Sequence, residues 1–338
     1  MYMPVLKGRE GEFTAISNLT DDLIPHLLPI MEVQPTGKGP AKDTWDFTVK
    51  VRDRLPCNLL IAVDVRYLAD PPSNVRRPLQ SIAADLDALK VPMLPVVHLQ
   101  DSRDRMTDVG DAAELHCGRA VLRLGSEVVD PDDEDAERML NKIRKDAGLT
   151  PEQCDLVIDM FEMRSERDLT RAEPIARKCL AWAQRRPWRS IAVAAGAMPD
   201  SMSHLPPRTA SPIRRWDIAL WQRVQEEAIH YGDYAIAHPR MTGKGWRPGP
   251  NLRYTADDSW WIYRWPDRDA NAAMHELCDA LISSDHWPSN GATFSWGDEE
   301  IARRARDGSR PGNPTNWRAW GTSHHLVHVI DQLNRLET

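Results

Sequence analysis

The stretch Leu60-Ile61-Ala62-Val63-Asp64 is a short apolar run that ends in a charged residue. Seven other apolar segments recur along the chain, and nearly every one ends in a charged residue or a histidine; they cover residues 4–7, 28–32, 94–98, 120–123, 156–159, 191–196 and 234–238. Continuous apolar runs are typical of strands that are buried on both faces, as in a parallel sheet. The segments begin about 25–45 residues apart, the length of one strand, one helix and two loops. The pattern predicts a TIM-type (β/α)8 barrel, an α/β fold whose functional sites lie at the C-terminal ends of the strands.

Amphipathic helices are expected between the apolar segments. Residues 77–90 and 169–186 carry apolar side chains at helical spacing. Residues 212–230 are expected to form a further helix with Pro212 in its first turn, where proline is well tolerated. Residues 271–284 are the expected eighth helix of the barrel.

The C-terminal part of the chain departs from this regular pattern. Twelve of the 13 tryptophans lie after residue 180. We expect a barrel over residues 1–285, with a β-hairpin insertion near residues 250–266 that turns at Asp257-Asp258. Residues 286–338 are expected to form a Trp-rich C-terminal elaboration that packs on the barrel.

Composition restricts the class of protein and its partners. The net charge of −7 over 338 residues argues against bulk binding to nucleic acid or to an anionic membrane. No apolar run approaches the ~20 residues that span a bilayer. The N-terminus leads directly into the first predicted strand, so we expect no signal peptide. Five scattered cysteines without CxxC spacing predict free thiols and a cytoplasmic location.

The charged and histidine residues at the predicted strand ends are the candidate functional site. A parallel barrel brings these ends to one rim. The expected members are Lys7, Glu32, Asp64, His98, Arg123, Asp159 and His238. We expect Lys7, Glu32, Asp64, His98 and Asp159 as catalytic groups, because such a set supplies general acids and bases. The alternative is a satisfied ion-pair network that closes the top of the barrel, since an unpaired buried charge is costly.

A divalent metal ion is an option that the acidic residues allow. Glu32, Asp64, Asp159 and His98 are suitable ligands for a magnesium-, manganese- or zinc-type ion. No close-spaced HxH or HExxH motif supports a metal site. The sequence therefore leaves the cofactor unknown.

Ligand contacts are expected from cationic and polar residues around the rim. Arg9 and Glu10 lie in the first loop, between two glycines, and Arg9 is suited to bidentate binding of a phosphate or carboxylate. Arg123 and His238 are further expected contacts. The alternative for the first loop is a solvated run of alternating charge.

The last predicted helix carries His324, His325 and His328. Two histidines four residues apart can share a metal ion, but packing or hydrogen bonding to neighbouring loops is the favoured interpretation. Tryptophans in the same region can stack on bases or sugars, but a small subdomain also needs large core residues.

Two segments resemble a known family. They are residues 2–12 with Ile30-Met31-Glu32, and the tail Trp317-Arg318-Ala319-Trp320-Gly321-Thr322-Ser323-His324-His325-Leu326-Val327-His328-Val329-Ile330. They resemble the opening and the closing motif of the phage beta-protein family, and together they bracket nearly the whole chain. The resemblance implies a phage-conflict, mobile-element or antiviral-defence context, and no particular reaction. It also draws attention to Lys7, Glu10, Glu32, Trp317, Arg318, His324 and His325. Of these, Glu10, Trp317, Arg318, His324 and His325 are expected ligand contacts.

Two functions are compatible with the sequence. The first is a hydrolase that acts on a phosphorylated or nucleotide-like ligand, with Lys7, Arg9 and Arg123 neutralising phosphate charge. The second is a non-catalytic scaffold or sensor that binds a protein partner. No Walker A loop, GxGxxG or GxSxG motif is present. The sequence therefore does not indicate one of the common nucleotide-binding folds or a serine hydrolase.

Overall fold

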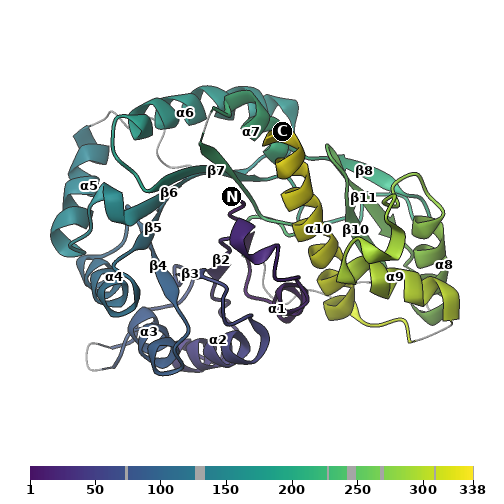
Figure 1. Cartoon of the computed structure of the whole chain (residues 1–338), viewed down its shortest axis with the longest axis horizontal. Helices are drawn as coiled ribbons and strands as arrows, with labels where there is room; N and C mark the ends of the chain where they lie inside the picture. The colour runs from purple at the N-terminus through teal and green to yellow at the C-terminus, as the bar shows by residue number, and fades with distance from the viewer. Residues whose placement is uncertain are drawn as a thin grey trace.

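The computed structural model describes the chain except for residues 73–74, 126–133, 227, 242–248, 267–269, 308–309 and 338. Within this part of the chain, eight parallel strands form a ring that helices surround (Figure 1). In spatial order the strands are β1 (Val5–Leu6), β2 (Ile30–Glu32), β3 (Ile61–Asp64), β4 (Met93–His98), β5 (Ala120–Leu124), β6 (Cys154–Glu162), β7 (Ser190–Gly196) and β9 (Ile229–Asp233).

Residues just before β1 close the ring. The main-chain N–H of Met3 donates to the carbonyl of Tyr231 at 2.9 Å, and Tyr2 forms a parallel bridge with Tyr231. A Cβ on Gly232 would lie 2.9 Å from Met3 O, so only glycine permits this close approach. The predicted TIM-type barrel is confirmed.

Helices connect successive strands and cover the outside of the ring (Figure 1). They are α1 (Glu10–Ser17), α2 (Pro40–Arg54), α3 (Pro78–Ala88), α4 (Arg103–His116), α5 (Glu134–Asp146), α6 (Glu166–Gln184) and α7 (Trp216–Val224), with short 3-10 turns η1 (Ile24–His26) and η2 (Pro151–Gln153). Ser102 and Ser165 cap α4 and α6 by accepting a hydrogen bond from the main-chain N–H three residues later.

Two predicted elements differ from the structure. The eighth barrel strand is β9, so the prediction of a strand over residues 234–238 is wrong; that apolar segment is buried because it turns inward over the barrel mouth. The predicted helix 212–230 is wrong at both ends, because strand β8 (Ser211–Arg214) precedes α7 and strand β9 begins at Ile229. Pro212 lies in β8, which is an edge strand of a second sheet, where a missing N–H is tolerated.

A second unit lies beside the barrel (Figure 1). The predicted hairpin is confirmed: β10 (Asn251–Thr255) and β11 (Ser259–Arg264) are antiparallel, and β8 joins them in a three-stranded sheet. Helices α8 (Ala270–Ile282) and α9 (Trp296–Asp307), with the 3-10 turn η3 (Gly291–Thr293), pack on this sheet around a core that includes Trp317 and Trp320.

The last helix, α10 (Pro314–Glu337), joins the two units. Its first part packs in the core of the second unit, whereas Leu326, Val329, Ile330 and Leu333 pack in the barrel core beside α1. α10 therefore fills the position that residues 271–284 were expected to occupy, and α8 belongs to the second unit instead. Both helices are amphipathic, and amphipathicity alone does not decide which core a helix covers. The division of the chain into domains at residue 285 stays a prediction.

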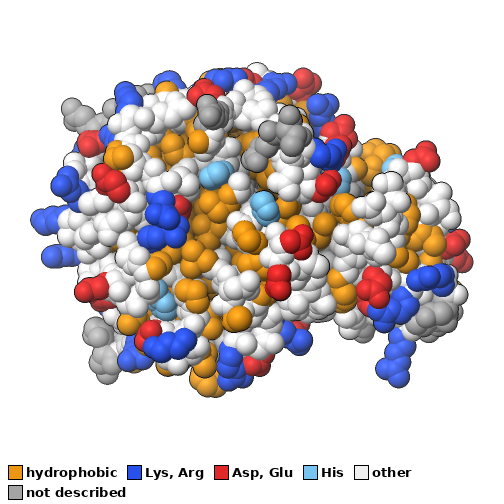
Figure 2. Space-filling model, viewed as in Figure 1, with side chains coloured by type: hydrophobic (Ala, Val, Ile, Leu, Met, Phe, Trp, Pro, Cys, Tyr) orange, Lys and Arg blue, Asp and Glu red, His pale blue; other side chains and the backbone are white. Residues whose placement is uncertain are grey.

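The described residues contain no helix that is both long and apolar enough to cross a membrane. On the face seen in Figure 2, hydrophobic side chains gather over the middle of the barrel, and acidic and basic side chains alternate around its edge. The described part of this face therefore presents no continuous basic surface.

Candidate functional site

Side-chain alternation along the strands creates the site. Residues that point into the barrel form an apolar interior that includes Val5, Ile30, Ala62, Val96, Val121 and Val157. Two residues further along each of these strands, the next inward position is polar: Lys7, Glu32, Asp64, His98, Arg123 and Asp159. The strand register places Glu32 opposite Asp64 and His98 opposite Arg123. Six of the predicted rim residues therefore meet at one level of the barrel, at the C-terminal ends of the strands.

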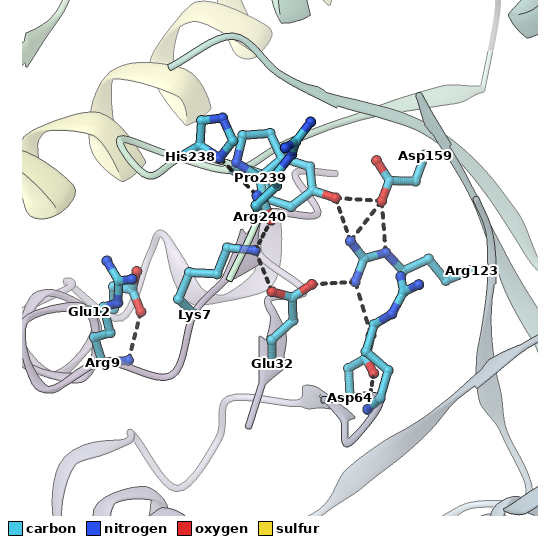
Figure 3. A network of polar contacts seen from close by, with 12 residues as sticks. Lys7, Arg9, Glu12, Glu32, Asp64, Arg123, Asp159, His238, Pro239 and Arg240 are labelled. Carbon is cyan, nitrogen blue, oxygen red and sulfur yellow. Dashed lines mark hydrogen bonds and ion pairs between the residues drawn. The ribbon is translucent and has the colours of Figure 1, made fainter. Parts of the chain in front are cut away.

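Arg123 lies at the centre of this network (Figure 3). Its Nη1 atom lies 2.7 Å from Glu32 Oε1 and 2.9 Å from Asp64 Oδ2, and its Nη2 atom lies 2.7 Å from Asp159 Oδ2. Lys7 Nζ donates to Glu32 Oε2 at 2.5 Å. Two cations thus join three carboxylates in one connected set.

The network is sealed from solvent. Lys7, Glu32, Asp64 and Arg123 are 0% exposed, and Asp159 is 2% exposed. Burial lowers the pKa of Lys7, although Glu32 acts in the opposite direction. Burial also disfavours the charged form of Arg123, but Tyr234, Asp159 and Glu32 outweigh it and raise the pKa of Arg123. Both groups are therefore paired inside a dry environment, where breaking one pair is expensive.

The segment that follows β9 covers this network. Tyr234 points into the barrel, where its hydroxyl accepts from Arg123 Nη2 and donates to Asp159 Oδ2 at 2.6 Å. The carbonyl of Pro239 accepts a hydrogen bond from Lys7 Nζ (Figure 3). Gly196, at the end of β7, makes room for this cover, since a Cβ there would lie 2.8 Å from Tyr234 Cδ2. The mouth of the barrel is thus filled by the chain itself.

His98 and Asp64 form a dyad at one side of the network. His98 Nε2 lies 2.9 Å from Asp64 Oδ2, and the main-chain N–H of Arg66 donates to Asp64 Oδ1 at 2.9 Å. Burial acts to raise the pKa of Asp64, but His98 and Arg123 outweigh it and hold the pKa below its ordinary value. Asp64 is therefore a carboxylate, and it accepts a hydrogen bond from His98 Nε2.

The other imidazole nitrogen, His98 Nδ1, is buried and has no hydrogen-bond partner among the described residues. A cavity of about 10 Å³ lies beside His98, enough for about one water molecule. It is lined in part by Asp64, Arg66, Asp70, Asp101 and Arg105. Asp101 accepts the main-chain N–H of His98 at 2.8 Å, and burial raises the pKa of Asp101. Two carboxyl groups with oppositely shifted pKa values thus flank one histidine.

The carboxylates of the network that were expected as metal ligands are partners of a cationic side chain instead. The guanidinium of Arg123 already bonds Glu32, Asp64 and Asp159, the acids that were expected as ligands. Among the described residues, no group of three or more His, Cys, Asp or Glu side chains is arranged to hold a metal ion.

The remaining predicted rim residues lie outside the sealed network. His238 follows β9 in the covering segment, where its Nε2 atom lies 3.3 Å from Glu162 Oε1. Glu10 is exposed and pairs with Arg54 of α2 at 3.0 Å. Arg9 precedes α1, and its main-chain N–H donates to Glu12 Oε2 at 2.8 Å (Figure 3). Their roles as ligand contacts stay predictions.

Residues of the tail motif lie in and around α10. Trp317 is buried, and its Nε1 donates to Pro311 O at 2.8 Å. His324 Nδ1 lies 2.9 Å from Asp298 Oδ2, and its ring stacks on Tyr254 with a centroid distance of 3.8 Å. These two positions join α10 to the second unit.

His325 connects α10 to the barrel through a second buried network. Its Nε2 atom lies 2.9 Å from Asp233 Oδ2, and Tyr2 OH donates to Asp233 Oδ1 at 2.5 Å. Tyr231 OH donates to Asp217 Oδ2 at 2.6 Å, and Arg215 Nη2 donates to Tyr231 OH at 3.1 Å.

The sequence interpretation missed several residues of the two networks. Asp233 is the charged residue at the end of β9, and His230 and Gly232 interrupt the apolar run that marks the other strands. Tyr234 and Asp101 follow strands within three residues, and this position is their only sequence signal. Pro239 acts through its main chain, so no side-chain pattern identifies it.

The fold and the site together define a class: a (β/α)8-barrel protein with a buried ion-pair network across the C-terminal ends of its strands. A family model described as Beta protein matches residues 2–331, nearly the full chain. The chain therefore belongs to the Beta protein family. A search of curated proteins gave no match.

Proposed function

We propose that this protein is a hydrolase of phosphorylated or nucleotide-like ligands, in which Asp64 and His98 activate a water molecule. The observation that carries the proposal is His98 Nδ1, an unpartnered nitrogen among the described residues, beside a cavity that fits about one water. Asp64 holds the proton on Nε2, so Nδ1 presents its lone pair. An oriented imidazole with a free nitrogen is a suitable general base.

The reaction that this arrangement supports is attack of water on a phosphate ester. His98 Nδ1 takes a proton from the water while the water oxygen forms a bond to phosphorus. The bond between phosphorus and the ester oxygen breaks, and the carboxyl of Asp101, in its protonated form, donates its proton to the leaving oxygen. The raised pKa of Asp101 favours this acid role, and the lowered pKa of Asp64 favours a charged partner for the imidazolium. Proton transfer from His98 to Asp101 through solvent restores the starting state.

Arg66 is the expected contact for the phosphate group. Its side chain is exposed at the cavity and lies over the Tyr67 ring at 5.6 Å, whereas the neighbouring Arg105 pairs with Asp70 at 2.9 Å. Asp64 is held in position by the sealed network of Lys7, Glu32, Arg123 and Asp159, because Arg123 Nη1 donates to Asp64 Oδ2. In this proposal Lys7, Glu32 and Asp159 are positioning residues.

The test measures turnover of p-nitrophenyl phosphate, an alkyl phosphate and a set of nucleotides. His98→Gln is expected to lower turnover by roughly 10²–10⁴ with little loss of stability. His116→Gln is the matched control, since His116 lies on the outer helix α4 and its Nε2 atom bonds the Ala83 carbonyl. Asp101→Asn is expected to slow the alkyl phosphate more than the p-nitrophenyl ester, whose leaving group needs no proton. Equal turnover by the wild type and His98→Gln, or none by the wild type, would overturn the proposal.

A second candidate is a non-catalytic scaffold or sensor that binds a protein partner. The full burial and mutual pairing of Lys7, Glu32, Arg123 and Asp159 favour it, because catalytic groups must reach a ligand. In this case His98→Gln leaves function unchanged, and binding of a partner protein persists without any turnover.

The cellular setting is part of the proposal. None of the five cysteines forms a disulfide, which supports a reducing, cytoplasmic compartment. The net charge of −7 supports a small phosphorylated ligand over bulk nucleic acid. A hydrolase of nucleotide-like ligands fits the phage-conflict or antiviral-defence context that the resemblance implies.

A further inference from the structure

Three arginine side chains from separate elements lie near one another beside the barrel mouth. Arg9 follows β1, Arg253 lies in β10, and Arg318 lies in the first turns of α10. Burial and the guanidiniums of Arg318 and Arg9 lower the pKa of Arg253 to about 9. Burial and the guanidinium of Arg9 also lower the pKa of Arg318. The three cations therefore repel one another in a partly buried place.

Two glycines let the backbones that carry these arginines come together. A Cβ on Gly11 of α1 would lie 2.7 Å from Thr315 O and 3.2 Å from the Cβ of Arg318. A Cβ on Gly321 of α10 would lie 2.8 Å from Arg253 O. Any side chain at either position would push the elements apart. The closeness of the arginines is thus a property of the packed fold.

Among the described residues, acidic side chains offset only part of the positive charge of Arg253 and Arg318. Glu12 is the acidic neighbour of Arg318, and its Oε2 atom already accepts the main-chain N–H of Arg9. Arg253 donates to the carbonyl of Ile236, which is a neutral group. Arg318 makes no hydrogen bond or ion pair with any other described residue. Partly buried cations that are only partly compensated are costly, and an anionic ligand would lower that cost for Arg253 and Arg318.

We propose that Arg253 and Arg318, together with Arg9, bind a small oxyanion such as phosphate or the phosphate group of a larger ligand. Guanidinium groups match tetrahedral oxyanions because their N–H donors lie in a planar fork. The site differs from the proposed hydrolytic cavity, which residues of β3, β4 and their following segments line in part. It contacts the covering segment through Ile236, three residues before Pro239. A bound anion would therefore also stabilise the segment that closes the barrel.

The experiment follows thermal unfolding of the full chain during titration with inorganic phosphate, at constant ionic strength set by chloride. The wild type is expected to show a saturable rise in melting temperature. Arg318→Gln should bind phosphate about tenfold or more weakly, because a charge-assisted hydrogen bond is lost. Without phosphate, the same variant should melt no lower than the wild type, because one repulsive charge is gone. A merely structural arginine would lower the melting temperature in both conditions.

Two further variants make the test specific. Arg52→Gln, on the exposed face of α2, should keep the full phosphate response. Arg66→Gln removes the expected phosphate contact of the hydrolytic cavity, so the phosphate response that this variant retains reports on the arginine site. The proposal is overturned if phosphate stabilises the wild type and Arg318→Gln equally, or does not stabilise the wild type. It is also overturned if the phosphate response is lost in Arg66→Gln but kept in Arg318→Gln. Arg253→Gln loses the bond to Ile236 and can fail to fold. In that case, the phosphate response of Arg318→Gln still tests the proposal.

Discussion

Arg123 donates two hydrogen bonds to a single oxygen of Asp159: its Nε and Nη2 atoms lie 2.9 and 2.7 Å from Oδ2. The other oxygen, Oδ1, accepts the main-chain N–H of Phe161 at 2.9 Å. Asp159 thus connects a buried cation on β5 to the backbone at the end of β6. This pairing is the reason that a guanidinium can remain charged in the middle of the barrel.

Asp159→Asn keeps the size of the side chain and removes its charge. We expect it to lower the free energy of unfolding by about 3–5 kcal/mol, because Arg123 loses a buried partner. Urea denaturation measures this change. The control is Asp53→Asn, an exposed partner of Arg52, for which we expect a change within about 0.5 kcal/mol. A similar small change in Asp159→Asn would show that Glu32 and Asp64 suffice to compensate Arg123.

Lys7 and Glu32 should be energetically coupled. Each single variant, Lys7→Met or Glu32→Gln, leaves a buried charge without a partner, whereas the double variant removes both charges. The double variant is therefore expected to be more stable than the sum of the single losses by about 0.5–3 kcal/mol. A double-mutant cycle from denaturant titrations measures the coupling. Strict additivity would contradict a direct pair.

Gly196→Val should open the cover of the barrel. The new side chain would collide with Tyr234, so the segment after β9 has to move. We expect a loss of about 1–3 kcal/mol in stability, as for other overpacked sites. Lys7 should then react with an amine-directed acylating reagent, detected by mass spectrometry, whereas Lys7 of the wild type stays unmodified. An unreactive Lys7 in the variant would mean that other residues seal the network.

Acidification should destabilise the protein through histidines of α10. Burial lowers the pKa of His328 to about 4, and burial also lowers the pKa of His325. Because the folded-state pKa lies below the unfolded value of about 6.5, the unfolded state binds more protons below that pH. Stability is therefore full above about pH 6.5 and is lost as the pH falls toward 4.

His328→Gln tests this prediction, since it removes one of the titrating groups. Between pH 7 and pH 5, the wild type should lose up to about 2 kcal/mol more than the variant. Melting curves across this range measure the difference. The carboxyls of Asp233 and Asp257 do not contribute here, because their pKa values are lowered and both stay ionised. Parallel curves for the two proteins would contradict the assignment to His328.

The sequence by itself determined the barrel and the inward-facing rim residues. Apolar runs at regular spacing define parallel strands, and a charged residue at the end of each run comes to the common rim. Lys7, Glu32, Asp64, His98, Arg123 and Asp159 could therefore be predicted as neighbours, because strand periodicity and parallel pairing are local rules. The same rules failed for β9, where His230 and Gly232 interrupt the run and an apolar covering segment follows it.

Only the tertiary structure decided how these residues are used. Arg123 takes the place between three carboxylates, Tyr234 and Pro239 cover them, and His98 keeps one nitrogen beside a cavity. It also decided that α10 completes the barrel and that Arg253 lies near Arg9 and Arg318. Contacts of this kind depend on which faces pack together over long sequence separations. Hydrophobic periodicity defines a face of a helix or strand, but it does not specify the surface that covers it.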